Sequence, residues 1–144
     1  MESFDAMPPD PARPAAQDTA VRRPAVPASV TELRWAARDL ALENGADEGL
    51  AGDVMLAVSE AVTNSIKHAY PDCEGEVELA VSLAADRTLV VTVRDTGTGF
   101  GPTASEGLGA GLMLMSECAD ELEVDEGPGG VTVRMVFHLQ RPLA

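Results

Sequence analysis

Residues 59–70 read SEAVTNSIKHAY and close a segment of helical periodicity that runs from about Glu48 to Ala69. At 100° per residue, the small and apolar side chains of this segment fall on one stripe. The members of the stripe are Val54, Val58, Ala61, Val62, Ser65 and Ala69. A polar group on an adjacent face consists of Glu60, Asn64, Lys67 and His68. Because Pro71 cannot continue a helix, the pattern predicts one helix with an apolar face and a separate polar face.

The residues before this helix predict a further helix and a short edge strand. Helical spacing recurs at Val30, Leu33, Ala37 and Leu40. Ser29 or Thr31 is the expected N-cap of this helix, and Gly45 is its expected end. Residues 18–28 are compatible with an edge strand that is interrupted by two prolines.

The residues after the long helix predict a sheet. Alternating apolar residues indicate strands at Val77–Leu83, Leu89–Val93, Leu122–Val124 and Val131–Leu139. Turns are expected near Ala85-Asp86 and at Gly127–Gly130, a loop at 95–107, and a helix from Leu108 to Ala119. These elements predict an α/β two-layer sandwich, in which a mixed, mostly antiparallel sheet is covered on one face by helices.

Composition bounds the domain and its partners. Residues 1–17 are rich in proline and alanine and are expected to be a disordered leader, so that the folded domain spans 18–144. The net charge of −14 argues against direct nucleic-acid binding and against an anionic membrane surface, and it would steer a basic protein partner towards the chain. No membrane span or signal peptide is visible, and Cys73 and Cys118 fit two reduced thiols, so a cytoplasmic protein is expected.

The polar helix face carries groups suited to phosphate chemistry. Glu60 and Asn64 are four residues apart and His68 is four further, so the three project the same way. A carboxylate accepts a proton from a hydroxyl, and an amide oxygen suits Mg²⁺, which takes few protein ligands. Lys67 or His68 can meet phosphate oxygens. Taken alone, this segment is more typical of a solvated polar face than of a binding site.

Asp95, in the stretch VRDTGTGF, continues the parity of Leu89, Val91 and Val93. Its carboxylate is therefore expected on the core face, where a charge needs a donor such as an adenine amino group. An Asx turn at a strand end, with Gly97 and Gly99 at positive φ, is the alternative. Further on, the glycines of Gly107-Leu-Gly-Ala-Gly-Leu112 would let phosphates approach the backbone at a helix start. The chain has no GxxxxGK[ST] loop.

The order SEAVTNSIKHAY, VRDTGTGF, GLGAGLMLM and GGVTVRM resembles the Bergerat ATP-binding fold of the histidine-kinase-like ATPases over about residues 28–139. Within that superfamily the chain is most similar to the bacterial anti-sigma factor serine kinases. This resemblance implies ATP and Mg²⁺ as cofactors and Glu60 as the general base. It implies Asn64 as the magnesium ligand and Asp95 as the adenine reader. The further nucleotide-binding positions are Lys67, His68, Gly97, Gly99, Gly107, Gly109, Gly111, Leu112 and Thr132.

The same resemblance implies the partners and the reaction. Members of the family bind a sigma factor, many phosphorylate a serine of a small antagonist protein, and they often form homodimers. Two departures from the family's sequence pattern favour the alternative of a non-enzymatic ATP-binding anti-sigma or adaptor module. Val131 stands where the family often has a hydroxyl residue, with Thr132 pointing the opposite way, and no Lys or Arg occurs from Gly97 to Glu117. A histidine kinase would need an upstream phospho-accepting histidine, whereas His68 and His138 both lie within the domain.

Overall fold

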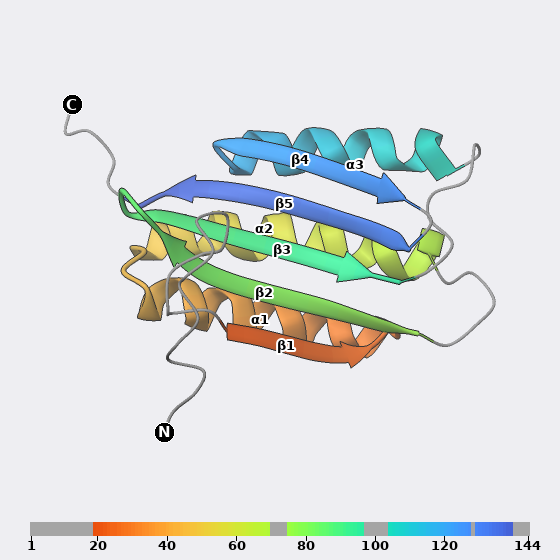
Figure 1. The fold of residues 1–144 in the computed structure, drawn as a ribbon, viewed down its shortest axis with the longest axis horizontal. Coiled ribbons are helices and arrows are strands. Elements are labelled where there is room, and N and C mark those ends of the chain that lie inside the picture. Colours follow the sequence, from red (N-terminus) through yellow and green to blue (C-terminus); the bar gives the residue numbers. More distant parts are fainter. Residues whose placement is uncertain (1–18, 70–74, 97–103, 128, 140–144) are drawn as a thin grey trace, which may run out of the picture.

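The computed structural model describes residues 19–69, 75–96, 104–127 and 129–139 (Figure 1). The strands in these residues are β1 (Thr19–Pro24), β2 (Glu76–Ala84), β3 (Thr88–Asp95), β4 (Glu121–Gly127) and β5 (Gly130–His138). The helices are α1 (Pro27–Glu43), α2 (Glu48–Asn64) and α3 (Ala104–Cys118), and a π-helical turn, η2 (Ser65–Ala69), continues α2. The expected leader at 1–17 lies outside the described residues.

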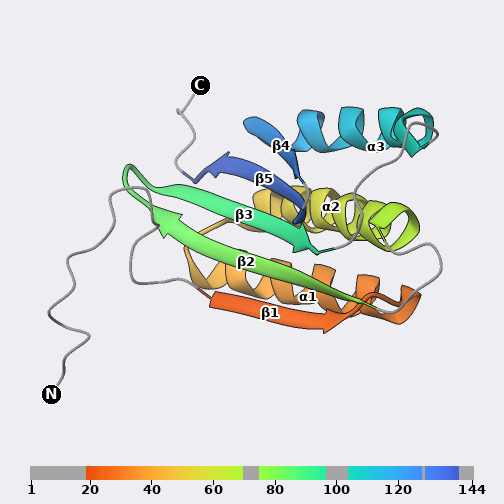
Figure 2. The same ribbon diagram turned by 45° about the vertical axis from the view of Figure 1, so that its right-hand side comes forward.

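The strands form one sheet in the order β1-β2-β3-β5-β4, and each described neighbour pair is antiparallel. The helices lie together on one face of this sheet (Figures 1 and 2). The predicted two-layer α/β sandwich is therefore confirmed, with no parallel pair among the described strands. The ambiguous segment 18–28 does supply an edge strand, β1, and Pro24 stands at its end, where an edge strand tolerates a missing donor.

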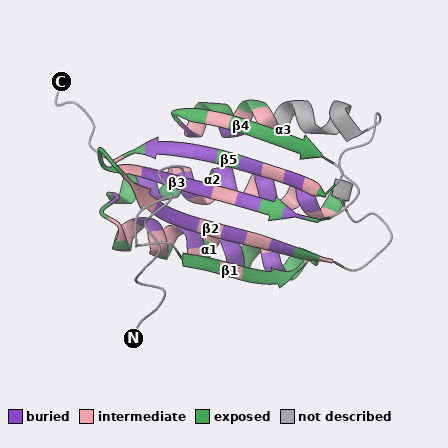
Figure 3. Ribbon diagram, viewed as in Figure 1, coloured by how far each residue is buried: buried purple, intermediate pink, exposed green. Residues whose placement is uncertain are grey.

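The core lies between the sheet and the helices. Alternate residues of β2, β3 and β5 are buried, and they face the apolar stripe of α2 together with residues of α1 (Figure 3). The largest fully buried side chains include Phe137, Leu33, Leu50 and Leu79. Aliphatic side chains thus fill almost the whole core, as the low aromatic content of the chain requires.

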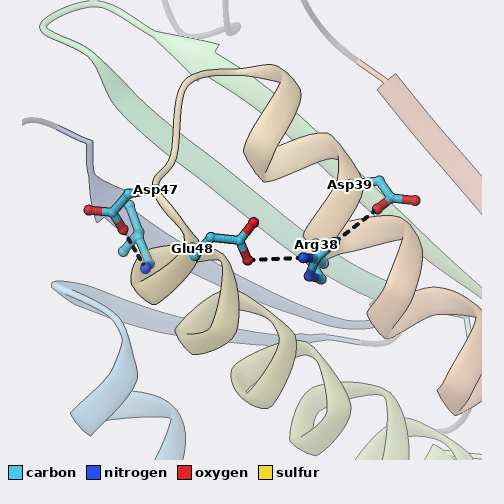
Figure 4. A network of polar contacts seen from close by, with 5 residues as sticks. Arg38, Asp39, Asp47 and Glu48 are labelled. Atoms are coloured by element: carbon cyan, nitrogen blue, oxygen red, sulfur yellow. Dashed lines mark hydrogen bonds and ion pairs between the residues drawn. The ribbon is translucent and has the colours of Figure 1, made fainter.

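The starts of α1 and α2 use different devices. The prediction that Ser29 or Thr31 caps α1 is wrong, because the helix begins at Pro27 and its N-cap, Val26, makes no side-chain cap bond. Pro27 suits a first helical position, since its φ is preset and its missing N–H would have no helical partner there. In α2 the Asp47 carboxylate accepts a bond of 2.7 Å from the backbone N–H of Leu50 (Figure 4).

An ion pair ties the same helix start to α1. Arg38 donates to Glu48 Oε1 at 2.9 Å and lies 3.6 Å from the carboxylate of Asp39, so it links the two helices at their solvent side (Figure 4). An exposed pair of this kind contributes little to stability, about 0–1 kcal/mol. The packing of α1 on α2 therefore rests on the buried apolar residues.

We expect Gly130→Ala to destabilise the fold by roughly 1–3 kcal/mol. Gly130 has φ +129°, and a Cβ there would overlap the backbone oxygen of Asp95 and lie 2.8 Å from Thr96 Cα. The matched control is Gly52→Ala in α2, where an added Cβ meets nothing within 4 Å. That change should stabilise by about 0.5–1 kcal/mol, because Gly in a helix interior loses more entropy than Ala. Urea unfolding of wild type and the two variants measures both changes in the free energy of unfolding. Equal midpoints for Gly130→Ala and wild type would contradict the expected strain.

Candidate functional site

Glu60 and Asn64 lie one helical turn apart near the end of α2. Glu60 is half-buried, whereas Asn64 is only 7% exposed. The Nδ2 atom of Asn64 is buried and has no hydrogen-bond partner among the described residues. A buried amide donor is normally satisfied, because leaving it unpaired costs about 1–3 kcal/mol. The Asn64 side chain is therefore poised for an acceptor that the described residues do not supply.

Gly111 of α3 lies directly against this pair. A Cβ built on Gly111 would stand 2.9 Å from Asn64 Nδ2, 3.2 Å from Glu60 Oε1 and 3.6 Å from Asn64 Oδ1. Only a glycine lets the α3 backbone approach α2 so closely at this point, because any side chain would displace the amide. The structure thus brings together residues of two motifs that are far apart in the sequence.

Asp95 is the last residue of β3. It lies in register with Val77 on β2 and Val131 on β5, and it is 2% exposed. Its predicted position on the core face is confirmed. The end of α2 reaches the same end of the molecule, because η2 packs against β3 and β5 (Figure 1). The carboxylate of Asp95, the Glu60–Asn64 pair and Gly111 therefore come from three elements that meet at one end of the domain.

Gly130, which belongs to the predicted turn and to the motif GGVTVRM, holds the backbone next to Asp95. Its positive φ and its closeness to the Asp95 carbonyl leave no room for a side chain. Gly130 is therefore a positioning residue for the end of β3. The stretch Gly127-Pro-Gly-Gly130 was the available signal, but an ordinary turn explains it equally well.

Several predicted residues lie differently from expectation. The α-helix ends at Asn64 and η2 follows, whereas a single helix was predicted as far as Ala69. A π-helical turn is bonded i→i+5, so the four-residue spacing that was to align His68 with Asn64 no longer applies. Lys67 is exposed in η2, and the surroundings of the His68 side chain lie outside the description.

The start of α3 also differs from the prediction. The helix begins at Ala104 instead of Leu108, so that Gly107, which was expected at the end of a loop, lies within the helix. Ala104 and Glu106 favour a helix start, and an acidic residue in the first turn complements the helix dipole. Leu112 is partly buried and packs on the core. Gly97 and Gly99 lie outside the described residues.

Thr132 lines one cavity together with Asp95 and Gly130, although it belongs to the other face of the sheet. Val131 points into the core and is 1% exposed, so the next residue, Thr132, projects from the outer face of the sheet. Its neighbours in register there are Arg94 on β3 and Asp125 on β4. Strand parity turns Thr132 away from the core face that holds Asp95, and its expected nucleotide contact stays a prediction.

Other reactive groups in the described residues do not form a second centre. Cys118 is a free thiol, and its pKa is raised, chiefly by burial and further by the carboxylates of Asp53 and Glu117. It therefore stays protonated at neutral pH. No group of three or more His, Cys, Asp or Glu side chains comes together in the described parts of the chain to hold a metal ion. None of the described helices has the length and hydropathy needed to cross a membrane.

Comparisons with known proteins agree with this fold. The chain matches the family model of the histidine kinase-like ATPase domain over residues 23–137. It is 33% identical to the anti-sigma F factor of Bacillus subtilis strain 168, over 64% of this chain and 72% of that protein. It is 37% identical to the serine-protein kinase RsbW of the same strain, over 81% of this chain and 82% of that protein.

A solved structure of similar fold contains the RsbU and RsbW domains of a Mycobacterium tuberculosis protein. The match has a TM-score of 0.70 and 26% identity, and it covers 87% of this chain. Our chain spans about a third of that longer chain, since the match covers 33% of it. The protein therefore belongs to the histidine kinase-like ATPase family, among its anti-sigma factors and serine-protein kinases, as the four motifs predicted.

Proposed function

We propose that this protein is an ATP-dependent serine kinase that regulates a sigma factor by partner switching. In this function it binds the sigma factor and transfers the γ-phosphate of ATP to a serine of an antagonist protein. The relatives named anti-sigma F factor and serine-protein kinase RsbW support the proposal. The observation that carries it is the contact of Gly111 with the Glu60–Asn64 pair, at which Asn64 keeps a buried, unsatisfied donor.

The residues at this site fit Mg-ATP. Asn64 offers its Oδ1 as the one protein ligand of Mg²⁺, which prefers oxygen ligands and readily keeps phosphate oxygens and waters as the rest. Its Nδ2 would then donate to a phosphate oxygen, which would satisfy the buried donor. Gly111 has no side chain to displace the amide, which keeps Glu60 and Asn64 in place for a bound phosphate. Bound Mg²⁺ would neutralise charge that develops on the transferred group.

Asp95 is proposed to select the adenine base. A carboxylate that is 2% exposed accepts hydrogen bonds in a poorly hydrated site, where such bonds are stronger than in water. The exocyclic amino group of adenine is a donor of the right kind, whereas guanine presents an oxygen at that position. Asp95 would thereby favour ATP over GTP.

Glu60 is proposed as the general base. It would take the proton of the substrate serine hydroxyl while that oxygen bonds to the γ-phosphorus and the bond from phosphorus to the bridging oxygen breaks, leaving ADP. The base lies one turn before Asn64, so the two residues can act on neighbouring atoms of the same phosphate. Most of the catalysis in such a transfer comes from positioning and charge neutralisation.

A binding module without kinase activity is the second candidate. No Lys or Arg occurs from Gly97 to Glu117, so no cation in that stretch could stabilise the transferred phosphate. The core-facing position of Val131 removes the hydroxyl that relatives often have there. ATP would then serve only as a structural ligand of an anti-sigma or adaptor protein.

The charge of the chain bears on the kind of partner that it binds. We propose a cytoplasmic protein that acts on a sigma factor and an antagonist without contacting nucleic acid itself, with a homodimer as a further possibility. The net charge of −14 supports protein partners of basic character over a phosphate backbone.

The test is a phosphotransfer assay with proteins that copurify from the native host. Wild-type protein is mixed with γ-labelled ATP and each partner, and mass spectrometry locates the modified residue. Transfer to a serine of a small partner supports the kinase. Tight ATP binding without transfer to any copurifying protein would establish the binding module in its place.

A further inference from the structure

Strand β4 forms one rim of the sheet and exposes almost its whole length (Figures 1 and 3). Within the described parts of the chain it pairs with β5 alone, so its outer edge carries backbone N–H and C=O groups that no described strand bonds. Its seven residues would span about 23 Å. Open edges of this kind are templates for a further strand, and proteins usually obstruct them.

The two edge strands are protected in different ways. At the opposite rim, β1 ends in Pro24, and its Arg22 and Arg23 are paired with Glu78 and Glu32. In β4 there is no proline, and its register with β5 runs without a bulge from Glu121 to Gly127. Among the described residues its protection is charge, because its sequence ELEVDEG holds four carboxylates and no cation. Such protection repels acidic or identical strands but attracts basic ones.

The two faces of β4 favour different side chains in a strand that pairs with it. Glu121, Glu123 and Asp125 alternate along the outer face of the sheet. Leu122 packs on the core side, and Val124 next to it is 36% exposed. Val124 is left uncovered because α3 packs chiefly on α2 and only lightly on β4. A strand laid along this edge would meet three carboxylates on one face. On the other face it would meet Leu122 and Val124, with Glu126 at the end of the strand.

We propose that the β4 edge binds an extended segment of a protein partner in which Lys or Arg alternates with apolar residues. The segment would add a sixth strand to the sheet. Its basic side chains would lie opposite Glu121, Glu123 and Asp125, and its apolar side chains beside Leu122 and Val124. A second copy of this chain is a poor occupant, since pairing β4 with β4 sets carboxylates against carboxylates. The surface does not depend on the nucleotide site or on the proposed kinase reaction.

The test uses an end-blocked, fluorescent peptide, Lys-Val-Lys-Val-Lys-Val-Lys, titrated against the full chain at 150 mM salt, where long-range attraction is largely screened. Two control peptides keep the charge. One has the same composition with its four lysines in a block, and the other has every backbone nitrogen methylated. We expect saturable binding of the first peptide and at least tenfold weaker binding of both controls. In wild-type protein, amide chemical shifts should move mainly over Glu121–Gly127.

The protein variant is Glu121→Lys with Asp125→Lys, which leaves the contact of Glu123 with Arg134 in place. Reversing two cross-strand charge pairs should weaken peptide binding about tenfold. The matched control, Glu43→Lys with Glu117→Lys, changes the net charge equally at exposed helix positions and should change binding less than threefold.

Several results would overturn the proposal. Equal binding of the methylated or block peptide would show adsorption to a charged surface instead of strand addition. An equal loss in the control variant would show an effect of net charge. Absence of saturation up to 1 mM peptide would exclude a basic partner strand at this edge. If the protein alone sediments as a dimer and added peptide dissociates it, the edge binds a second copy of the chain instead.

Discussion

Glu60→Gln is expected to reduce phosphotransfer by roughly 10²–10⁴-fold, the usual contribution of a positioned general base. Glutamine keeps the shape of the side chain and a hydrogen-bonding oxygen, but it cannot take a proton from the serine hydroxyl. ATP affinity should change less than about threefold, because Asn64, Gly111 and Asp95 are untouched. The measurement is single-turnover transfer from labelled ATP to the cognate antagonist, beside a nucleotide-binding titration of the same protein.

Glu43→Gln on α1 is the matched control for this experiment, because Glu43 is an exposed glutamate at the far end of α1 from Pro27. It should transfer phosphate at the wild-type rate. A Glu60→Gln protein that is equally active would leave the kinase in place but remove Glu60 as its base. A loss of ATP binding in parallel with transfer would instead make Glu60 a structural support of Asn64.

Asp95→Asn is expected to weaken ATP binding about ten- to a hundredfold, because a hydrogen bond to a buried charged group contributes about 1.5–3 kcal/mol. Calorimetry with ATP and with purine riboside triphosphate, which lacks the 6-amino group, separates base recognition from general damage. Wild type should bind the analogue as weakly as the variant binds ATP. The variant itself should distinguish little between the two nucleotides.

Asp39→Asn is the control for the loss of a carboxylate, since Asp39 is exposed on α1 and does not line the cavity that contains Asp95. It should bind both nucleotides like wild type. Equal affinity of wild type and Asp95→Asn for ATP would refute the assignment of Asp95 as the adenine reader. A thermal melt of Asp95→Asn checks that the buried substitution leaves the domain folded.

Much of the fold was predictable because short-range periodicity of the sequence determines which segments form helices and strands. The apolar stripe of α2 and the alternation along β2, β3 and β5 each repeat within a few residues. These patterns can therefore be recognised without knowing which elements pack against them. The same parity placed Asp95 on the core face. The element ends were less predictable. Pro27 and not a hydroxyl residue begins α1, and α3 begins at Ala104, four residues before the predicted start at Leu108.

The sequence by itself determined the family, the helix that carries Glu60 and Asn64, and the face on which Asp95 lies, because motif order and residue periodicity are properties of the chain alone. Only the tertiary structure decided the strand order β1-β2-β3-β5-β4, the close approach of Gly111 to Asn64, the π-helical turn after Asn64 and the open edge of β4. These features depend on contacts between residues far apart in the chain. Local preference leaves such contacts undetermined until the sheet and the helices pack against each other.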